Sequence, residues 1–130
     1  MGDQQYQSLI RRVRQDKDSR FAEAAYYFVL DALDFTMFRL GRNSMEGEAR
    51  HVSVQELVEG IRGFATEEFG PLAPYVFRSW GVTKTEDFGH IVFEMCDAGL
   101  LNRRETDRLQ DFRDVFDLHT GFDEIESLRI

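Results

Sequence analysis

The sequence predicts a mainly α-helical protein, built as a single domain from five to six helices. Apolar residues recur at three- and four-residue intervals in several segments, which is the period of one helix face. Glycine and proline stand between these segments, where helices end and begin. The most regular stretch, residues 53–101, holds three such segments and predicts a helix-turn-helix-like core. A chain of 130 residues, 42% of them hydrophobic and 12 of them phenylalanine, suits one domain with one core.

Two helices are expected before this core. Residues 3–17 repeat apolar side chains on one helix face and carry arginines elsewhere. Residues 20–40 are the most apolar part of the chain, with apolar side chains on more than half of the helix surface. A helix of that kind belongs in the middle of a domain, with neighbours on two or more sides. Gly41 is expected to cap it, and the polar stretch 42–50 is typical of a flexible loop.

The core stretch opens on a predicted capping box. The side-chain oxygen of Ser53 can accept from the amide of Glu56, whose carboxylate can reach back to the amide of Ser53. The helix that follows is expected to end near Gly70. Gly60 and Gly63 lie inside it, where each costs about 1 kcal/mol relative to alanine. We therefore expect another helix to approach closely at these glycines.

Two further helices complete the core. A short helix is expected to begin at Pro71, which suits a first helical turn, and to end before Gly81. The next helix begins at Thr83 or at Thr85, since either threonine is followed by acidic residues that favour a helix start. Gly99 is the natural left-handed residue after its end.

The C-terminal part allows two interpretations. Residues 115–118 fit the end of a short helix, and they fit a strand equally well. As a strand they would pair with residues 99–102, with 51–52 as a third member, and this small C-terminal β wing would make the domain winged-helix-like. The core then covers about residues 20–118, and the tail 119–130 is expected to dock as a last short turn.

The composition excludes several classes of protein. No apolar run approaches the length of about 20 residues that spans a bilayer. The polar N-terminus has no signal-peptide core. Cys96 is the only cysteine, so an intramolecular disulfide cannot form. Together these features predict a cytoplasmic protein without a membrane contact.

The formal charge of −8 is spread unevenly along the chain. Residues 86–130 carry 12 acidic and 5 basic side chains, whereas residues 1–20 carry five basic and three acidic ones. A negative chain repels a phosphate backbone, which disfavours nucleic acid as a partner. The basic face of the first helix can contact nucleic acid or a membrane, or it can face the acidic C-terminal half. We favour the last interpretation.

An ordered set of motifs between residues 20 and 118 carries a family resemblance. The motifs are FVLDALD (28–34), HVS (51–53), EL (56–57), FGPL (69–72), WGV (80–82), TEDFG (85–89), IVF (91–93), AGLL (98–101), DF (111–112) and FD (116–117). With them the chain resembles a family of small uncharacterised proteins found chiefly in the Planctomycetes and Verrucomicrobia group of bacteria. The resemblance implies a cytosolic, single-domain bacterial protein, and it implies no activity, cofactor or catalytic residue.

One helix of the core presents a candidate metal-binding set. Asp87, His90 and Glu94 follow one another at three- and four-residue steps, which places them on one side of the helix. A di-iron bundle needs two such elements and further glutamates from facing helices. A zinc site would have to recruit His51 or His119 as well. The simpler interpretation is a polar helix face in which His90 pairs with an acidic neighbour, so we expect no cofactor.

Other residues suited to chemistry have simpler interpretations too. No nucleophile motif surrounds Cys96, and a lone helical cysteine is usually a small packed hydrophobe. Asp111, Asp114 and Asp117 recur at three-residue spacing, which suggests calcium. The segment lacks the glycine and the closing glutamate of an EF-hand loop, and we favour a solvated acidic edge.

Arg78 and Trp80 are the candidates for contact with a partner. Arginine and tryptophan are enriched at the energetic centres of protein interfaces, although a tryptophan beside a tight turn also serves as a core plug. Because no catalytic constellation is present, the leading hypothesis is a non-enzymatic protein-interaction or adaptor module that binds a protein partner through its acidic C-terminal half. A winged-helix nucleic-acid-binding protein is the first alternative, and a metal-dependent enzyme is the second.

Overall fold

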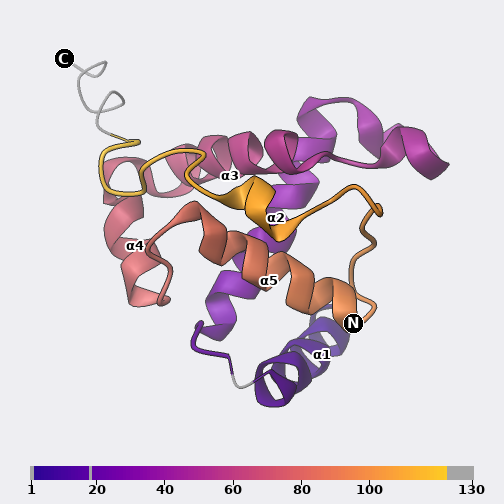
Figure 1. The fold of residues 1–130 in the computed structure, drawn as a ribbon, viewed down its shortest axis with the longest axis horizontal. Helices are drawn as coiled ribbons and strands as arrows, with labels where there is room; N and C mark the ends of the chain where they lie inside the picture. Colours follow the sequence, from indigo (N-terminus) through magenta and orange to yellow (C-terminus); the bar gives the residue numbers. More distant parts are fainter. Residues whose placement is uncertain (1, 18, 123–130) are drawn as a thin grey trace.

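The structure, a computed structural model, describes residues 2–17 and 19–122, and of residues 2–6 it describes the backbone alone. This part of the chain is mainly helical, as predicted (Figure 1). The α-helices and the short 3-10 helices, labelled η, run in the order α1 (Gly2–Asp16), α2 (Glu23–Arg39), η1 (Arg42–Ser44), η2 (Gly47–Arg50), α3 (Val54–Phe69), η3 (Gly70–Leu72), α4 (Ala73–Ser79), α5 (Thr85–Asp97) and η4 (Leu109–Phe112). None of the described helices is both long and apolar enough to cross a membrane. The predicted last turn of the tail, beyond residue 122, lies outside the described residues.

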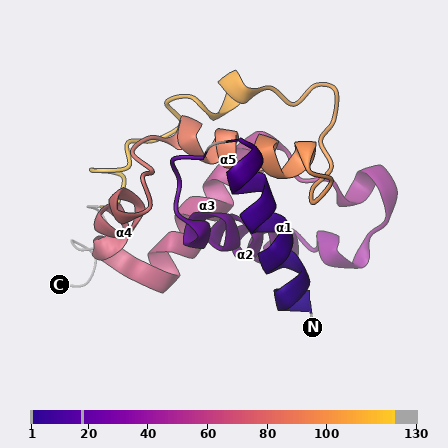
Figure 2. The same ribbon diagram turned by 90° about the horizontal axis from the view of Figure 1, so that it is seen from below.

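Helix α2 runs through the middle of the molecule (Figures 1 and 2). It contacts α1, α3 and α5, so it has neighbours on several sides, as its composition predicted. Its buried side chains are accordingly not confined to one stripe: they are Ala25, Tyr26, Phe28, Val29, Ala32, Thr36 and Met37.

Phe28 of α2 lies at the centre of a cluster of aromatic rings. Its ring centroid is 5.3–6.1 Å from the centroids of Phe64 and Phe69 of α3, Phe77 and Trp80 at the end of α4, and Phe88 of α5. Ring pairs at such distances contribute about 0.5–1.5 kcal/mol each beyond the burial of their area. One side chain therefore joins α2 to the three helices of the predicted core.

The start of α3 has the predicted capping box. The amide of Glu56 donates to the hydroxyl oxygen of Ser53 at 3.1 Å, and the amide of Ser53 donates to the carboxylate of Glu56 at 2.9 Å. Arg42 donates to both oxygens of that carboxylate at 2.7 Å and thereby holds the pKa of Glu56 below its usual range. The segment 42–50, expected as a flexible loop, instead forms η1 and η2 and is tied to α3.

Helices α2 and α3 cross closely at Gly60, as the internal glycines predicted. A Cβ atom on Gly60 would lie 1.7 Å from Oγ1 of Thr36, a side chain that is 3% exposed. The Thr36 hydroxyl donates to the carbonyl of Ala32 at 2.7 Å, so this buried hydroxyl is not left unpaired at the crossing. One turn later, a Cβ atom on Gly63 would meet the flexible end of Arg39 at 2.8 Å.

Each of the last two α-helices is followed by a glycine turn, as predicted. Gly81 after α4 and Gly99 after α5 have φ angles of 83° and 80°, which a side chain would strain. After α5 the amide of Leu100 donates to the carbonyl of Met95 at 2.9 Å, the bond of a Schellman motif. Of the two predicted starts of α5, the later one, Thr85, is right.

The described residues contain no strand, so the predicted β wing is wrong. Residues 113–118 instead lie as an irregular segment beside α5. The hydroxyl of Thr85 donates to the carbonyl of Phe112 at 2.5 Å and accepts from the amide of Val115 at 3.2 Å. The Phe112 ring packs where Gly89 leaves space, since a Cβ atom there would lie 2.7 Å from it. The carbonyl of Phe112 and the amide of Val115, which could otherwise pair with a strand, are thus bonded to a side chain of α5.

Gly60→Ala is expected to destabilise the protein. Alanine is the better helix former by about 1 kcal/mol, but its Cβ atom must push buried Thr36 and separate α2 from α3. We expect the free energy of unfolding to fall by about 1–3 kcal/mol, as overpacked cores do. Urea unfolding measures it. Gly63→Ala is the matched control, because only the end of Arg39 has to move. Equal stability of the two variants would contradict the close crossing at Gly60.

Candidate functional site

Asp87, His90 and Glu94 all lie on α5, but Asp87 bonds to groups at the start of the helix. Asp87 is 1% exposed. One carboxylate oxygen accepts from Arg20 at 2.6 Å, and the other accepts from the amide of Thr83 at 2.9 Å. A carboxylate in this place satisfies amides at the start of α5 and complements the helix dipole. Its lone pairs are therefore occupied by protein groups.

Glu94 faces α2 rather than Asp87. Its carboxylate accepts from the hydroxyl of Tyr26 at 2.7 Å, and Tyr26 also contacts the hydroxyl of Ser19. Burial raises the pKa of Glu94, and the Tyr26 hydrogen bond only partly opposes this. Burial likewise raises the pKa of Tyr26 above its usual range. Within residues 2–17 and 19–122, no three His, Cys, Asp or Glu side chains converge on a point where they could hold a metal ion.

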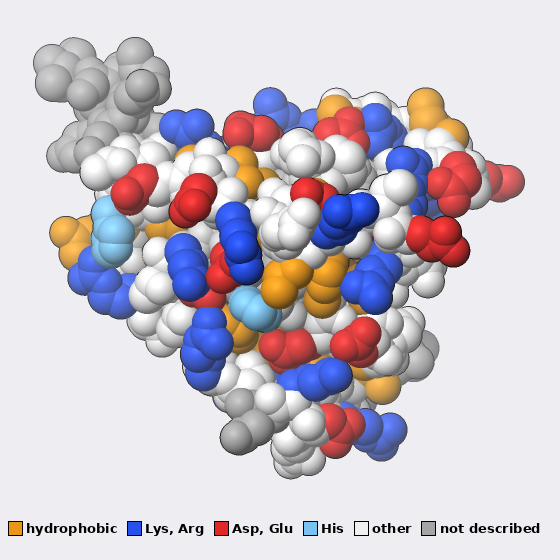
Figure 3. All heavy atoms as spheres, in the orientation of Figure 1, with side chains coloured by type: hydrophobic (Ala, Val, Ile, Leu, Met, Phe, Trp, Pro, Cys, Tyr) orange, Lys and Arg blue, Asp and Glu red, His pale blue; other side chains and the backbone are white. Residues whose placement is uncertain are grey.

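Acidic side chains of the C-terminal half make ion pairs within the chain. Asp97 pairs with Lys17, the residue after α1, at 3.2 Å, and Glu86 pairs with Arg113. The Asp97 pair joins α5 to the basic N-terminal segment, in agreement with the interpretation favoured for that segment. On the face in Figure 3, basic and acidic side chains are interspersed rather than separated. The acidic half therefore offers less unpaired charge than the sequence suggests.

Two of the three aspartates considered for calcium accept local hydrogen bonds. Asp111 accepts from the amide of Arg108 at 3.3 Å. Asp117 accepts from the amides of His119 and Thr120 at 2.7 and 3.1 Å, and these bonds hold its pKa below the usual range. Asp114 lies in a turn with a φ angle of 50°. Hydrogen bonds from an aspartate side chain to nearby backbone amides are typical of turns.

The two predicted partner-binding residues have different surroundings. Trp80 is half-buried, with its ring against Phe28, and its carbonyl accepts from the amide of Ala22 at 3.0 Å. It has the place of a core plug. Arg78 is exposed: it donates to Nδ1 of His119 at 3.1 Å, and its guanidinium lies 5.8 Å from the ring centroid of Tyr75. Arg78 thus remains available to a partner.

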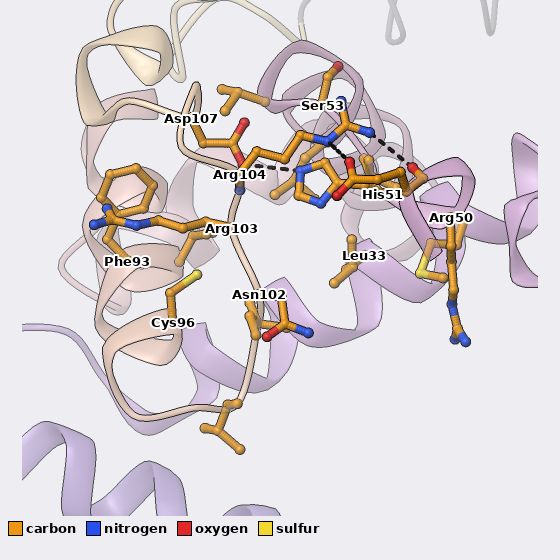
Figure 4. A pocket seen from close by; sticks show the side chains of 18 of the residues that line it. Leu33, Arg50, His51, Ser53, Phe93, Cys96, Asn102, Arg103, Arg104 and Asp107 are labelled. Carbon is orange, nitrogen blue, oxygen red and sulfur yellow. Dashed lines mark hydrogen bonds and ion pairs between the residues drawn. The ribbon is translucent and has the colours of Figure 1, made fainter. Parts of the chain in front are cut away.

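A hollow of about 730 Å³ opens between α2, the start of α3, α5 and the loop that follows α5 (Figure 4). We call it the α5 hollow. Its floor is apolar and comes from four separate segments: the lining side chains include Leu33, Leu57, Val92, Phe93, Cys96 and Leu101. Its rim is polar and carries Arg50, His51, Asn102, Arg103, Arg104 and Asp107. An apolar hollow with a few polar groups around it is the usual form of a binding site.

His51 stands on this rim in a fixed orientation. Its Nε2 atom lies 3.1 Å from a carboxylate oxygen of Asp107, and its carbonyl accepts from Arg42 at 2.7 Å. Because a carboxylate only accepts, we assign a hydrogen to Nε2, and Nδ1 is the second ring nitrogen. That second nitrogen is turned toward the hollow (Figure 4).

The arginines of the rim differ in their partners. Arg104 pairs with the carboxylate of Glu48 at 3.0 Å and donates to its carbonyl at 2.9 Å. Arg103 lies 4.8 Å over the ring of Phe93 and makes no ion pair with any described residue. The loop after α5 thus presents one guanidinium that is held in place and is free of a carboxylate.

Cys96 lines the hollow without the chemistry of a nucleophile. Burial raises the pKa of its thiol, and the charge of Arg103 only partly opposes this. The thiol form, which is the unreactive one, therefore prevails at neutral pH. This agrees with the packed cysteine expected from the sequence.

From the sequence we considered His51 as a zinc ligand and as part of a third strand, and we did not predict the hollow. One signal was available. Arg103 and Arg104 are the only adjacent basic pair within the acidic residues 86–130. Their position in the fold, beside Phe93 and opposite α2, depends on contacts that no local pattern reveals.

Comparison with known proteins adds no assignment, since no family model, no curated protein and no solved structure matches the chain. The resemblance to the bacterial family named above therefore stays a prediction, and the functional argument rests on the geometry.

Asp87→Asn is expected to lower the free energy of unfolding by about 1–3 kcal/mol, because it weakens charge-assisted bonds to a buried group. Asp97→Asn is the matched control, since it breaks an exposed pair worth about 0–1 kcal/mol. Chemical unfolding of both variants at neutral pH makes the comparison. If the two changes cost the same, Asp87 does not organise the start of α5.

Glu94→Gln is expected to gain stability relative to wild type as the pH rises. The folded state raises the pKa of Glu94 above its ordinary 4.5, so wild type loses stability between pH 4.5 and the folded pKa. Glutamine does not titrate and avoids this loss. Asp117→Asn should show the opposite trend, because the folded state lowers the pKa of Asp117. Urea unfolding at pH 4 and pH 7 measures the Glu94 effect, and unfolding at pH 4 and at lower pH measures the Asp117 effect, which lies below the ordinary pKa of 3.8. Trends of the same sign would contradict the assignment.

Proposed function

We propose that the protein is a non-enzymatic interaction module that binds a protein partner through the outer face of η3 and α4. The observation that supports this is a patch of three exposed side chains, Leu72, Tyr75 and Arg78, which we call the α4 patch. Leu72 is 63% exposed and Tyr75 is 65% exposed. The opposite side of α4 is buried through Phe77, so the patch cannot turn inward.

The composition and order of the α4 patch suit an interface. Steps of three residues place its members on one side of the helical segment. Tyrosine and arginine are the residue types enriched where interfaces gain most of their binding energy. Arg78 lies over the ring of Tyr75, so the two side chains restrain each other before any partner arrives. Restraint of this kind lowers the entropy lost on binding.

The charge of the patch indicates the chemistry of the partner. Arg78 donates to a ring nitrogen of His119 and makes no ion pair among the described residues. Its positive charge is therefore not neutralised by a neighbouring carboxylate. A partner that presents a carboxylate beside an apolar pocket would complement Arg78, Tyr75 and Leu72 together.

The two alternative functions draw less support from the geometry. The helix-turn-helix interpretation makes α5 the reading helix, yet α5 is packed between α2 and η4. Its acidic residues Glu86 and Asp87 are paired with arginines, and groove-binding helices need unpaired basic residues. A metal-dependent enzyme would need converging ligands, whereas Asp87 and Glu94 bond to different protein groups.

Photocrosslinking tests the α4 patch. The full chain, carrying a photoreactive phenylalanine analogue in place of Tyr75, is irradiated in the cells that naturally make the protein. We expect one protein to be captured in high yield. The same analogue in place of Arg12, on the exposed side of α1, is expected to capture none. Capture at position 12 alone, or at neither position, would contradict the proposed interface.

Binding of the purified partner then measures the contribution of each side chain. Tyr75→Ala and Arg78→Glu should each weaken binding by about thirtyfold, the loss of about 2 kcal/mol that defines an interface hot spot. Arg12→Glu is the matched control for the change of charge and should bind as wild type does. If Arg78→Glu also binds as wild type does, the α4 patch is not the interface.

A further inference from the structure

The α5 hollow is a second candidate site, and it is independent of the α4 patch. It is lined by the first turn of α3, through Val54 and Leu57, whereas η3 and α4 follow the last residue of α3. A helix of 16 residues is about 24 Å long. Loss of one site should therefore leave the other intact.

The floor of the hollow is suited to hydrocarbon. Its volume of about 730 Å³ lies within the range of about 300–1,000 Å³ that is typical of small-ligand sites. Leu33, Phe93 and Leu101 pack on the core with one side and remain partly exposed on the other. Covering that apolar surface with an apolar ligand removes it from water, which is favourable. The floor alone does not select a charge.

At the rim, Arg103 is the group suited to an anion. Glu48 is paired with Arg104, and Asp107 is hydrogen-bonded to His51. Asp34 and Arg50 also line the hollow, and their opposite charges add no net charge to it. The guanidinium of Arg103 makes no ion pair with any residue that the structure describes, so a ligand can contact it.

Arg103 is held in position from two directions. Its side chain lies against Phe93, which itself lines the hollow. Its backbone lies next to two contacts that fasten the loop to the segment before α3, the Arg104–Glu48 pair and the Asp107–His51 pair. None of its N–H groups has a hydrogen-bond acceptor among the described residues. A planar guanidinium with free donors matches the two oxygens of a carboxylate.

We propose that the α5 hollow binds an aliphatic monocarboxylate. The hydrocarbon chain of the ligand lies on Leu33, Phe93 and Leu101, and its carboxylate accepts hydrogen bonds from Arg103. The proposal includes no chemical step, and burial raises the pKa of the Cys96 thiol in the floor. The site is one of binding.

Titration of the full chain with decanoate, followed by amide chemical shifts, tests the proposal. Decanoate is kept below the concentration at which it forms micelles, and decanol, of equal chain length, is the uncharged comparison. We expect saturable shifts at amides around the hollow, such as those of Leu33, Cys96 and Asn102. Decanol should bind about tenfold more weakly, because it lacks the charge-assisted bonds. Equal affinities, or shifts that fail to saturate or lie elsewhere, would overturn the proposal.

Two variants locate the ligand. Arg103→Gln should weaken decanoate binding about tenfold and leave decanol binding unchanged, since it removes only the charge-assisted contact. Arg12→Gln, a matched change at an exposed arginine of α1, should alter neither. Asn102→Trp, at an exposed residue of the rim, should fill the hollow and abolish binding of both compounds. Undiminished decanoate binding by either Arg103→Gln or Asn102→Trp would assign the ligand to another place and overturn the proposal.

Discussion

The aromatic ring of Phe28 is the contact on which the arrangement of the helices depends. Rings from α3, α4 and α5 meet it, so burial of one α2 side chain fixes three helices relative to the fourth. With Phe77 drawn into this cluster, the other side of α4 has to face solvent, and Tyr75 and Arg78 become a surface. The same packing sets α5 against α2 and leaves the α5 hollow between them. Both candidate sites are thus consequences of how the core closes.

The polar residues of α5 show that ligand-like spacing has more than one use. Asp87 and Glu94 lie on the same helix at steps that suit a metal site, yet each is used by a different neighbour. Arg20 and the start of α5 engage Asp87, while Tyr26 of α2 engages Glu94. A carboxylate oxygen that accepts a hydrogen bond from the protein has fewer lone pairs available to bind a metal ion. The residues that face α5 decide whether these carboxylates bind a metal ion or bond to the protein. The spacing of residues within α5 gives no information about them.

Local signals in the sequence predicted the helices and their ends well, because the interactions that set them span only a few residues. The capping box at Ser53 and the glycine stop at Gly99 are examples, and both occur as predicted. Residues 115–118, for which helix and strand were both considered, form neither, and the amide of Val115 donates instead to Thr85, thirty residues earlier. The hollow was not predictable for the same reason, since it joins Arg103 to α2 and to the segment before α3. Long-range contacts decided what local patterns left open.

The core around Phe28 and the entrance of the α5 hollow are stabilised by different interactions. Around Phe28 the contacts are apolar rings, on which dissolved salt has little effect. The loop after α5 is fastened to the segment before α3 by Arg104–Glu48 and Asp107–His51, which are contacts between charged or titratable groups near the surface. Ions screen such pairs, with a Debye length of about 8 Å at physiological ionic strength. We therefore expect rising ionic strength to loosen the entrance of the α5 hollow before it affects the core, as a local opening separate from global unfolding.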